Sequence, residues 1–313
     1  MLRSLLIYLS HAEWARRIVT GWSFAWRAAS RFVAGEKLED AIQVVREMNA
    51  KGINVTLDHL GENTSDAARA AQATDDIIAA LAAIEAEGVR SNVSIKLTQI
   101  GLALDEELCA GNLQRLLEYA QERGTFVRID MEDSPYVQQT LDVFYELFER
   151  YHNLGVVIQS YLYRSDDDIE RLIKAGASVR MVKGAYLEPA TIAHQAKKDV
   201  DSAFIRQTER LMSREARANG VYTAIATHDE AIIEWTKRHA TEQGIPRDTF
   251  EFQMLYGIRR DLQAALVAQG YRMRVYVPYG RQWYPYYMRR IAEQPQNIIW
   301  VTQGVLRESM PRR

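Results

Sequence analysis

The chain has 313 residues, 47% hydrophobic and 26% charged, and its 39 Lys and Arg against 41 Asp and Glu leave a net charge of −2. This composition is typical of a globular enzyme and excludes a mainly disordered chain. A charge near zero argues against nucleic acid as a partner, because phosphate binding needs a basic surplus. The single cysteine, Cys109, excludes an internal disulfide and a cysteine-based metal site and is typical of a reducing compartment.

The first 35 residues differ in composition from the rest. They contain Trp14, Trp22 and Trp26, half of all the tryptophans, and a surplus of arginine. We expect a helical arm over residues 1–35 that packs on the main body or contacts lipid or another subunit. The apolar run at residues 5–9 is too short for a secretory signal or a membrane span. We therefore expect a cytoplasmic protein, either free or in peripheral contact with the inner face of the cell membrane.

Short β-branched runs alternate with amphipathic helical stretches through residues 36–313. At this length either two domains or one α/β barrel would be ordinary. Several helical stretches end in a glycine that can stop a helix, as at Gly88 and Gly124. Eight strand–helix units predict a single (βα)₈ barrel, with an open doubly wound sheet as the alternative. The runs cover residues 54–60, 92–98, 125–133, 154–161, 178–186, 221–229, 249–257 and 272–280.

Polar residues gather where these runs end, and in such a barrel the carboxyl ends of the strands form the active site. Charged residues inside β-branched runs are costly to bury unless paired, so they form either an internal ion-pair network or a site for a charged ligand. Asp133 and Asp229 are expected to cap the helices that follow them. The other polar residues at or near the strand ends are Asp58, His59, Glu62, Lys96, Asp130, Glu132, Gln159, Arg180, Lys183, Tyr186, Thr227, His228, Gln253 and Tyr276.

The segment 277–295 follows the last run and is rich in aromatic and basic residues. Helical spacing brings Tyr286, Arg289, Arg290 and Glu293 close together. Arginine binds carboxylates and phosphates through paired hydrogen bonds, although an Arg-Arg pair also occurs on solvated surface helices. Four neighbouring aromatic residues at 283–287 argue against full solvation. The pattern predicts a cationic cavity with aromatic walls for an anionic cofactor and a small carboxylate.

Several other kinds of site find no support in the motifs. The sequence contains no G-x-G-x-x-G, which argues against a Rossmann site, and no G-x-x-x-x-G-K-[ST], which argues against a P-loop. The six histidines form no His-x-His or His-Glu-x-x-His spacing, so no metal is expected. The nucleophile elbow G-x-S-x-G of serine hydrolases is absent as well.

The run sequences together resemble the short bacterial monofunctional proline dehydrogenases. The resemblance covers about residues 54 to 297 and is carried by SIKLTQIGL, VRIDMEDSP, VIQSYLYR, VRMVKGAYLEP, AIATHD and RVYVPYGRQWYPYYMRR. It implies a distorted barrel that binds FAD non-covalently. It also implies oxidation of L-proline to Δ¹-pyrroline-5-carboxylate by hydride transfer to flavin N5, with electrons passed to a quinone. Residues 36–313 would be the catalytic barrel, and a separate pyrroline-5-carboxylate dehydrogenase would take the second step.

The resemblance also implies roles for individual residues, position by position. Asp130, Arg180 and Tyr276 would be catalytic, and Glu62 would be a gate that pairs with Arg289. Substrate binding would use Lys96, Leu255, Tyr286, Arg289 and Arg290. Flavin binding would use Met131, Gln159, Arg180, Val182, Lys183, Gly184, Tyr186, Thr227, His228 and Glu293.

Two other functions remain open on the residues alone. A barrel enzyme could use Lys96 or Lys183 as a Schiff-base lysine, with or without pyridoxal phosphate. Alternatively, a non-catalytic protein could bind a membrane surface or a partner through the Trp- and Arg-rich arm.

Overall fold

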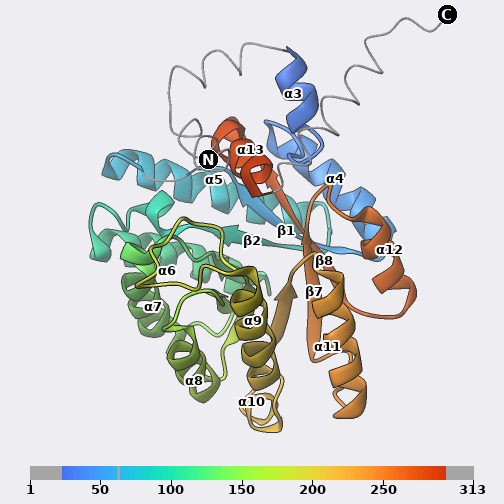
Figure 1. The fold of residues 1–313 in the computed structure, drawn as a ribbon. Helices are drawn as coiled ribbons and strands as arrows, with labels where there is room; N and C mark the ends of the chain where they lie inside the picture. Colours follow the sequence, from blue (N-terminus) through green and yellow to red (C-terminus); the bar gives the residue numbers. More distant parts are fainter. Residues whose placement is uncertain (1–22, 62–63, 294–313) are drawn as a thin grey trace, which may run out of the picture.

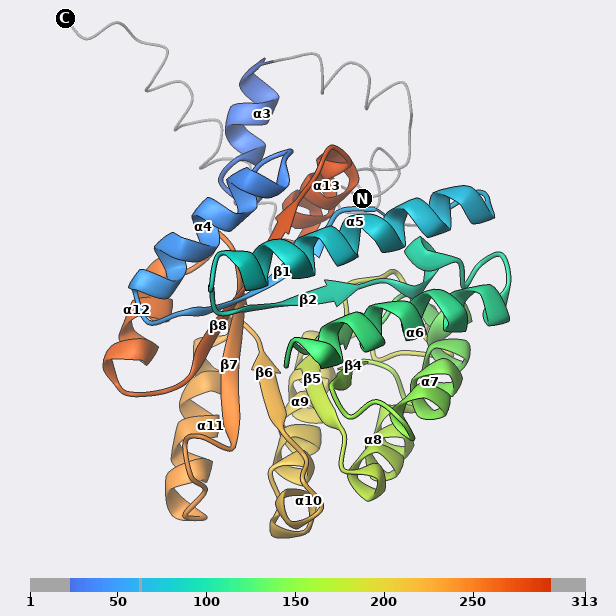
Figure 2. The same cartoon turned by 180° about the vertical axis from the view of Figure 1, so that it is seen from behind.

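A computed structural model describes residues 23–61 and 64–293 and shows a closed barrel of eight parallel strands (Figures 1 and 2). Each strand pairs with the next, and β8 pairs with β1 to close the barrel. The single barrel is therefore confirmed, and the open-sheet alternative is wrong. The strands are β1 Asn54–His59, β2 Ser91–Ile95, β3 Val127–Ile129, β4 Leu154–Gln159, β5 Ser178–Val182, β6 Thr223–Ala226, β7 Phe250–Leu255 and β8 Met273–Tyr279.

Helices surround the barrel, and most of them bury an apolar face against the strands (Figures 1 and 2). This layer between strands and helices is the hydrophobic core. The helical elements are α3 Ser23–Ala29, α4 Leu38–Ala50, α5 Ala67–Ala86, η1 Leu97–Ile100, α6 Glu106–Glu122, α7 Ser134–Phe148, α8 Ser165–Ala175, α9 Lys197–Leu211, α10 Arg214–Ala218, α11 Glu230–Glu242, α12 Arg260–Ala268 and α13 Trp283–Glu293.

The helix α5 shows how the local sequence produces these elements. Asp66 caps its first turn by accepting a hydrogen bond from the Arg69 amide at 2.9 Å. Ile77, Leu81 and Ile84 share one face through their three- and four-residue spacing and are buried. Beyond the helix the chain turns at Gly88, whose φ of 59° is the left-handed conformation expected for a helix stop.

The helix after the last strand, α13, departs from a regular barrel because it lies across the carboxyl end of the strands (Figure 1). The wall beside β1 and β8 is covered instead by α4, which precedes β1. Trp26, Ala29 and Phe32 of the predicted arm pack on aromatic residues of α13 such as Trp283 and Tyr287. The rest of the arm, residues 1–22, lies outside the described residues, so the division at residue 35 stays a prediction.

The amino end of the barrel interior is filled by a buried ion-pair network. Arg274 donates through Nε to Glu251 Oε1 at 2.7 Å and through Nη1 to Asn92 Oδ1 at 2.8 Å. Arg128 donates to the Ser178 hydroxyl at 2.9 Å and to two backbone carbonyls. Side chains thus close this end, and the open end is the one under α13.

The strand runs were expected to reach further than the strands do. The structure ends β2 at Ile95 and β3 at Ile129, so Lys96 and Asp130 lie just past the strands. A backbone hydrogen bond from Asp130 to Ile95 at 2.8 Å still fixes the two chain segments side by side. Within residues 23–61 and 64–293, no helix is long and apolar enough to cross a membrane.

Candidate active site

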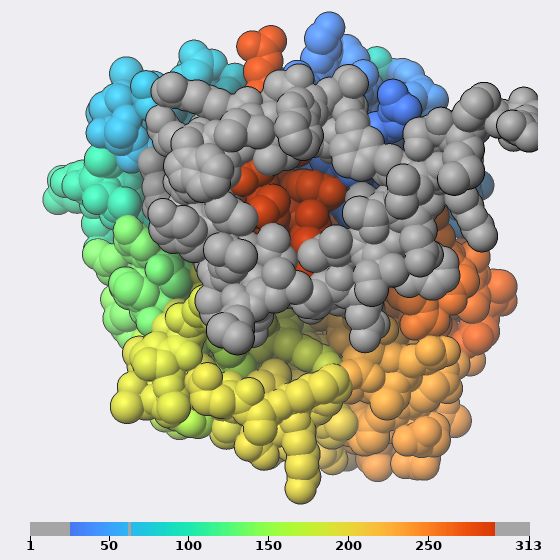
Figure 3. Space-filling model, turned by 45° about the horizontal axis from the view of Figure 1, so that its top comes forward, coloured from blue at the N-terminus to red at the C-terminus, as the bar shows by residue number. Residues whose placement is uncertain are grey.

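A cavity of about 510 Å³ opens at the carboxyl end of the barrel, beneath α13. Figure 3 looks onto this end of the molecule, where α13 appears at the centre in red. A volume of this size is in the usual range for a small-molecule site. The lining residues are Asp58, Lys96, Asp130, Met131, Val157, Gln159, Arg180, Val182, Lys183, Gly184, Ala185, Tyr186, Lys197, Ala226, Thr227, His228, Asp229, Gln253, Met254, Leu255, Tyr276, Tyr286, Arg289 and Arg290.

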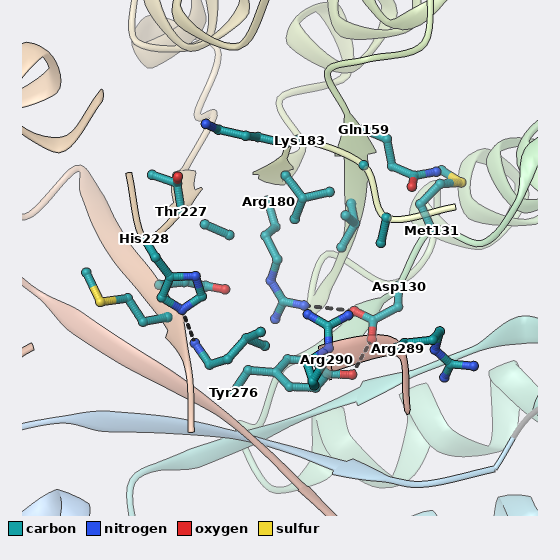
Figure 4. Close-up of a pocket in the computed structure, with 18 of the residues that line it drawn as sticks. Asp130, Met131, Gln159, Arg180, Lys183, Thr227, His228, Tyr276, Arg289 and Arg290 are labelled. Carbon is teal, nitrogen blue, oxygen red and sulfur yellow. Dashed lines mark hydrogen bonds and ion pairs between the residues drawn. The ribbon is translucent and has the colours of Figure 1, made fainter. Parts of the chain in front are cut away.

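The floor of the cavity is a network of two carboxylates, two cations and one phenol. Asp130 Oδ1 accepts from Arg180 Nη1 at 2.8 Å, and its Oδ2 accepts from the Tyr276 hydroxyl at 2.6 Å (Figure 4). Lys96 Nζ lies 3.3 Å from both carboxylate oxygens of Asp58 and 3.7 Å from Asp130 Oδ2. Two acids balance two bases, so the floor carries no net charge when all four groups are ionised.

Burial makes this network rigid and fixes the direction of its hydrogen bonds. Asp58 is fully buried, and charges at such depth are stable only when they are paired. Burial and the neighbouring carboxylates of Asp130 and Asp58 hold the pKa of Tyr276 well above its usual value. Tyr276 therefore stays protonated, and its hydroxyl donates to Asp130.

Arg180 is a floor residue whose hydrogen bonds are incomplete within the described residues. Its side chain is 5% exposed, and Nη1 bonds Asp130 and the Ser94 hydroxyl. Its Nε and Nη2 have no hydrogen-bond partner among residues 23–61 and 64–293. Unsatisfied donors on a buried guanidinium are costly, so these two nitrogens point to a polar ligand in the cavity.

The roof of the cavity is formed by α13. Tyr286, Arg289 and Arg290 all line the cavity, and Figure 4 shows both guanidinium groups on the same side of it as Asp130 and Tyr276. The expectation that one helix brings these side chains together is confirmed. Because the floor is balanced, the roof supplies much of the positive charge offered to a ligand.

A second ionic cluster borders the cavity on the side away from Tyr276, where Figure 4 places Lys183. Lys183 Nζ bonds Asp201 Oδ1 at 2.6 Å and Asp229 Oδ2 at 2.8 Å. Lys197 contacts the same two carboxylates. Burial alone would raise the pKa of Asp229, but the hydrogen bonds from Lys183 and Lys197 outweigh it and lower the pKa to about 2. Asp229 therefore stays ionised at neutral pH.

The chain turns sharply past β5 at Gly184, which leads from Lys183 to Tyr186. Its φ is 113°, and a Cβ there would lie 2.3 Å from the ring of Tyr161. Only glycine fits both conditions. The resemblance implies that Gly184 contacts a flavin, and within the described residues its close neighbour is Tyr161.

Sixteen of the eighteen site residues predicted from the sequence line this one cavity. Glu62 lies outside the described residues, and so does the side chain of Glu293 at the end of α13. Asp229 caps α11 as expected, by accepting from the Ala231 amide at 3.2 Å. Asp133 occupies the N-cap position of α7 as expected, but its side chain accepts no capping hydrogen bond, and Glu188 instead accepts from the amide and hydroxyl of Ser134.

Some lining residues received no role in the sequence analysis. Asp58 and Gln253 were noted at strand ends without a partner. Asp58 lies near the end of β1 and pairs with Lys96, which follows the neighbouring strand β2. Lys197 begins a helix thirteen residues past Gly184, and no strand-end pattern indicates it. Within the described residues no group of three or more His, Cys, Asp or Glu could hold a metal ion.

Comparison with known proteins places the chain in a family. The sequence model described as Proline dehydrogenase matches residues 41–302. A proline dehydrogenase from Deinococcus radiodurans is 48% identical over 287 residues, covering 90% of this chain and 91% of its own. Proline dehydrogenase 2 from Bacillus subtilis is 40% identical over 306 residues, covering 98% of this chain and 99% of its own.

A solved structure supports the fold. Proline utilization A from Bdellovibrio bacteriovorus, inactivated by N-propargylglycine, matches with a TM-score of 0.81 and 25% identity over 91% of this chain. The match covers 34% of that protein, so the chain spans about a third of its length. The family model and the two relatives together show that the chain belongs to the proline dehydrogenase family.

Proposed function

We propose that the protein is an FAD-dependent enzyme that oxidises L-proline to Δ¹-pyrroline-5-carboxylate. The proposal rests on charged side chains that converge on one cavity. Arg289 and Arg290 reach it from α13. Lys96, Arg180 and Asp130 reach it from the strands below. Cations converging on an enclosed volume with apolar walls suit a small organic acid held against a second, larger ligand.

The residues at the cavity fit a flavin. Within the described part of the chain, the buried Arg180 retains two donors without a hydrogen-bond partner, and the pyrimidine edge of an isoalloxazine offers acceptors for such donors. Met131, Val182 and Ala226 offer apolar contacts, and Gln159, Thr227 and Lys183 offer polar ones. These residues would hold the cofactor together with Gly184, Tyr186 and His228. When bound, the flavin would supply a two-electron acceptor for the oxidation of proline.

The substrate end is assigned to α13 and the floor. Arg289 and Arg290 would bind the carboxylate of proline, because guanidinium groups form paired hydrogen bonds with carboxylates. Lys96 would add a third cationic contact, with its ammonium held in place by Asp58 and Asp130. This clamp fixes the ring in one orientation and so removes much of the entropic barrier to reaction.

The floor and walls would position the reacting ring. Leu255, Tyr276 and Tyr286 line the cavity and offer apolar surface to the ring methylenes. Asp130 holds Tyr276 and Arg180 at once, so a single carboxylate orients one wall and one cation. Arg180 would stabilise negative charge that develops beside it during the reaction.

The Schiff-base alternative loses support at both lysines. Lys96 Nζ is surrounded by Asp58 and Asp130, and Lys183 Nζ by Asp201 and Asp229. A Schiff-base lysine has to react as a free amine, whereas these two ammonium groups are each engaged by two carboxylates. The arm on which the non-catalytic alternative depends lies mostly outside the described residues.

The proposal extends to partners. Electrons would pass to a quinone, and a separate pyrroline-5-carboxylate dehydrogenase would use the product. A quinone acceptor resides in membranes, which supports a cytoplasmic protein with peripheral contact at the inner face of the cell membrane.

Anaerobic titration of the purified protein with L-proline tests the proposal. We expect a yellow protein with two broad flavin absorption bands, the longer-wavelength of which disappears on addition of L-proline and not of D-proline. A colourless preparation that binds no added FAD would contradict the cofactor. A flavin spectrum unchanged by L-proline would contradict the substrate.

A further inference from the structure

The side chain of His228 completes the strand ladder between β6 and β7. The backbone pairing of these strands ends at Ala226 opposite Gln253, while β7 continues to Leu255. Two residues past the end of β6, His228 lies where the register would place the partner of Leu255. Its Nε2 accepts the Leu255 amide hydrogen at 3.0 Å (Figure 4). The imidazole thus supplies the acceptor that the next backbone carbonyl would have supplied.

This hydrogen bond determines the protonation of the ring. A backbone amide can only donate, so Nε2 must carry a lone pair and the proton of the neutral ring must be on Nδ1. The surroundings agree with a neutral ring, since burial and the nearby Arg290 and Arg259 lower the pKa of His228 to about 4. His228 is therefore neutral at physiological pH and presents an N–H donor from its other nitrogen.

Other hydrogen bonds attach the segment around Leu255 to β8 and to α12. Leu255 pairs with Tyr276 in the β7–β8 register, and the Tyr256 amide bonds the Tyr276 carbonyl at 2.9 Å. The loop that follows is tied to α12 by Gln263 Nε2, which donates to the Ile258 carbonyl at 2.7 Å. The bond from His228 holds the end of β7 toward β6, on the side opposite Tyr276.

We propose that His228 is a positioning residue that acts through Leu255. In its Nδ1-protonated form it anchors the end of β7 and so fixes the gap between the Leu255 and Tyr276 side chains, which sets the ring size that the cavity accepts. The identity of the ring rests on the function proposed above. The tautomer and the anchor do not depend on it.

The first test is the protonation state of His228 in the full-length protein as purified. We expect the two-bond ¹⁵N–¹H spectrum at pH 6 to show one neutral ring protonated at Nδ1 that is absent from the spectrum of His228→Gln. An unperturbed histidine, with a pKa of about 6.5, is mostly charged at that pH. An imidazolium, or a ring protonated at Nε2, would overturn the proposal.

The second test compares L-proline with L-pipecolate, its six-membered homologue, on each variant. His228→Leu removes the acceptor, and we expect the preference for proline in kcat/KM to fall roughly tenfold, the scale of a one-methylene discrimination. His228→Gln, whose amide oxygen can accept the same hydrogen bond, should keep the preference. For each variant, kcat/KM for the two substrates is measured on the same preparation. A partial loss of cofactor lowers both values equally and leaves their ratio unchanged.

The control is His239→Gln on the outer helix α11, which should keep both activities. If His228→Leu does not fold, His228→Asn replaces it, because its shorter side chain falls short of the Leu255 amide. An unchanged preference in the variant without the acceptor, or an equal loss in His228→Gln, would overturn the proposal. If the wild type oxidises neither substrate, the proposed function is wrong. The ¹⁵N–¹H spectrum still tests whether His228 accepts the hydrogen bond from Leu255.

Discussion

Buried ions occupy both ends of this barrel, but the two ends use them differently. At the amino end Arg274 is bonded to Glu251, Asn92 and the Val55 carbonyl, none of which lines the cavity. At the carboxyl end Arg180 is bonded through Nη1, while its Nε and Nη2 lack a partner within the described residues. The first end is closed by protein and the second faces a cavity.

The difference teaches that a buried charge indicates a ligand site when it lines a cavity, because incomplete hydrogen bonds alone do not separate the two ends. Arg128 Nε at the amino end also lacks a partner among the described residues, but Arg128 does not line the cavity. On the residues alone, the charged side chains in the strand runs could form either an ion-pair network or a ligand site. At the carboxyl end the charged residues form a network and also line a candidate ligand site. Asp130 pairs with Arg180 and Lys96, and all three line the cavity. At the amino end only the network is present.

Removing the charge of Asp130 should have the largest effect. In Asp130→Asn the two cations Arg180 and Lys96 lose a shared counter-ion, which should lower the free energy of unfolding by about 3–5 kcal/mol. It should also lower kcat/KM for proline by roughly 100-fold or more, the scale for a positioned electrostatic group. Urea unfolding and steady-state kinetics measure the two effects. If Asp130→Asn lost stability but kept the wild-type kcat/KM, the charges at the carboxyl end would be purely structural, like those at the amino end.

The matching change at the amino end is Glu251→Gln, which removes the charge but keeps an acceptor for Arg274. The unfolding free energy should fall by about 3 kcal/mol, because Arg274 then lacks its charged partner. The values of kcat and KM should stay as in the wild type, because Glu251 does not line the cavity. A rise in KM comparable to that of Asp130→Asn would break the distinction between the ends.

A smaller effect is expected from pH at the carboxyl end. The pKa of His228 is lowered from its ordinary value to about 4, by burial and by Arg290 and Arg259. Its neutral form stabilises the fold fully above about pH 6.5, and that stability is lost as pH falls toward 4. Between pH 8 and pH 5 the wild type should lose roughly 2 kcal/mol more than His228→Gln does. Equal pH dependence of unfolding in the two proteins would contradict this.

Much of the fold follows from local sequence. All eight strand runs form strands of the barrel, because β-branched runs bounded by helix stops leave few other arrangements. The expected strands overran at β2 and β3, where Lys96 and Asp130 lie beyond the last ladder residue. Period and composition do not show where a ladder ends, because the neighbouring strand decides it.

The site was predictable as a set of residues and much less as a set of contacts. Strand ends and the α13 spacing indicated twelve of the sixteen predicted residues that share one cavity, and the family resemblance added Met131, Val182, Gly184 and Leu255. The pairing of Lys96 with Asp58, and of Lys183 with Asp201, depends on how the barrel closes and where α9 begins. These pairings are set by tertiary packing, and no local sequence pattern predicts them.

The central claim is that the arginines of α13 bind the carboxylate of the substrate above the floor of the cavity. Calorimetric titration with cyclopentanecarboxylate, a ring acid without an amine to oxidise, tests it in the wild type and Arg290→Ala. The account predicts roughly 30-fold weaker binding or more in Arg290→Ala, the scale for truncating one partner of a buried charge pair. The control Arg281→Ala removes the same charge from an exposed loop and should bind normally. Equal affinity in the wild type and Arg290→Ala would contradict the account.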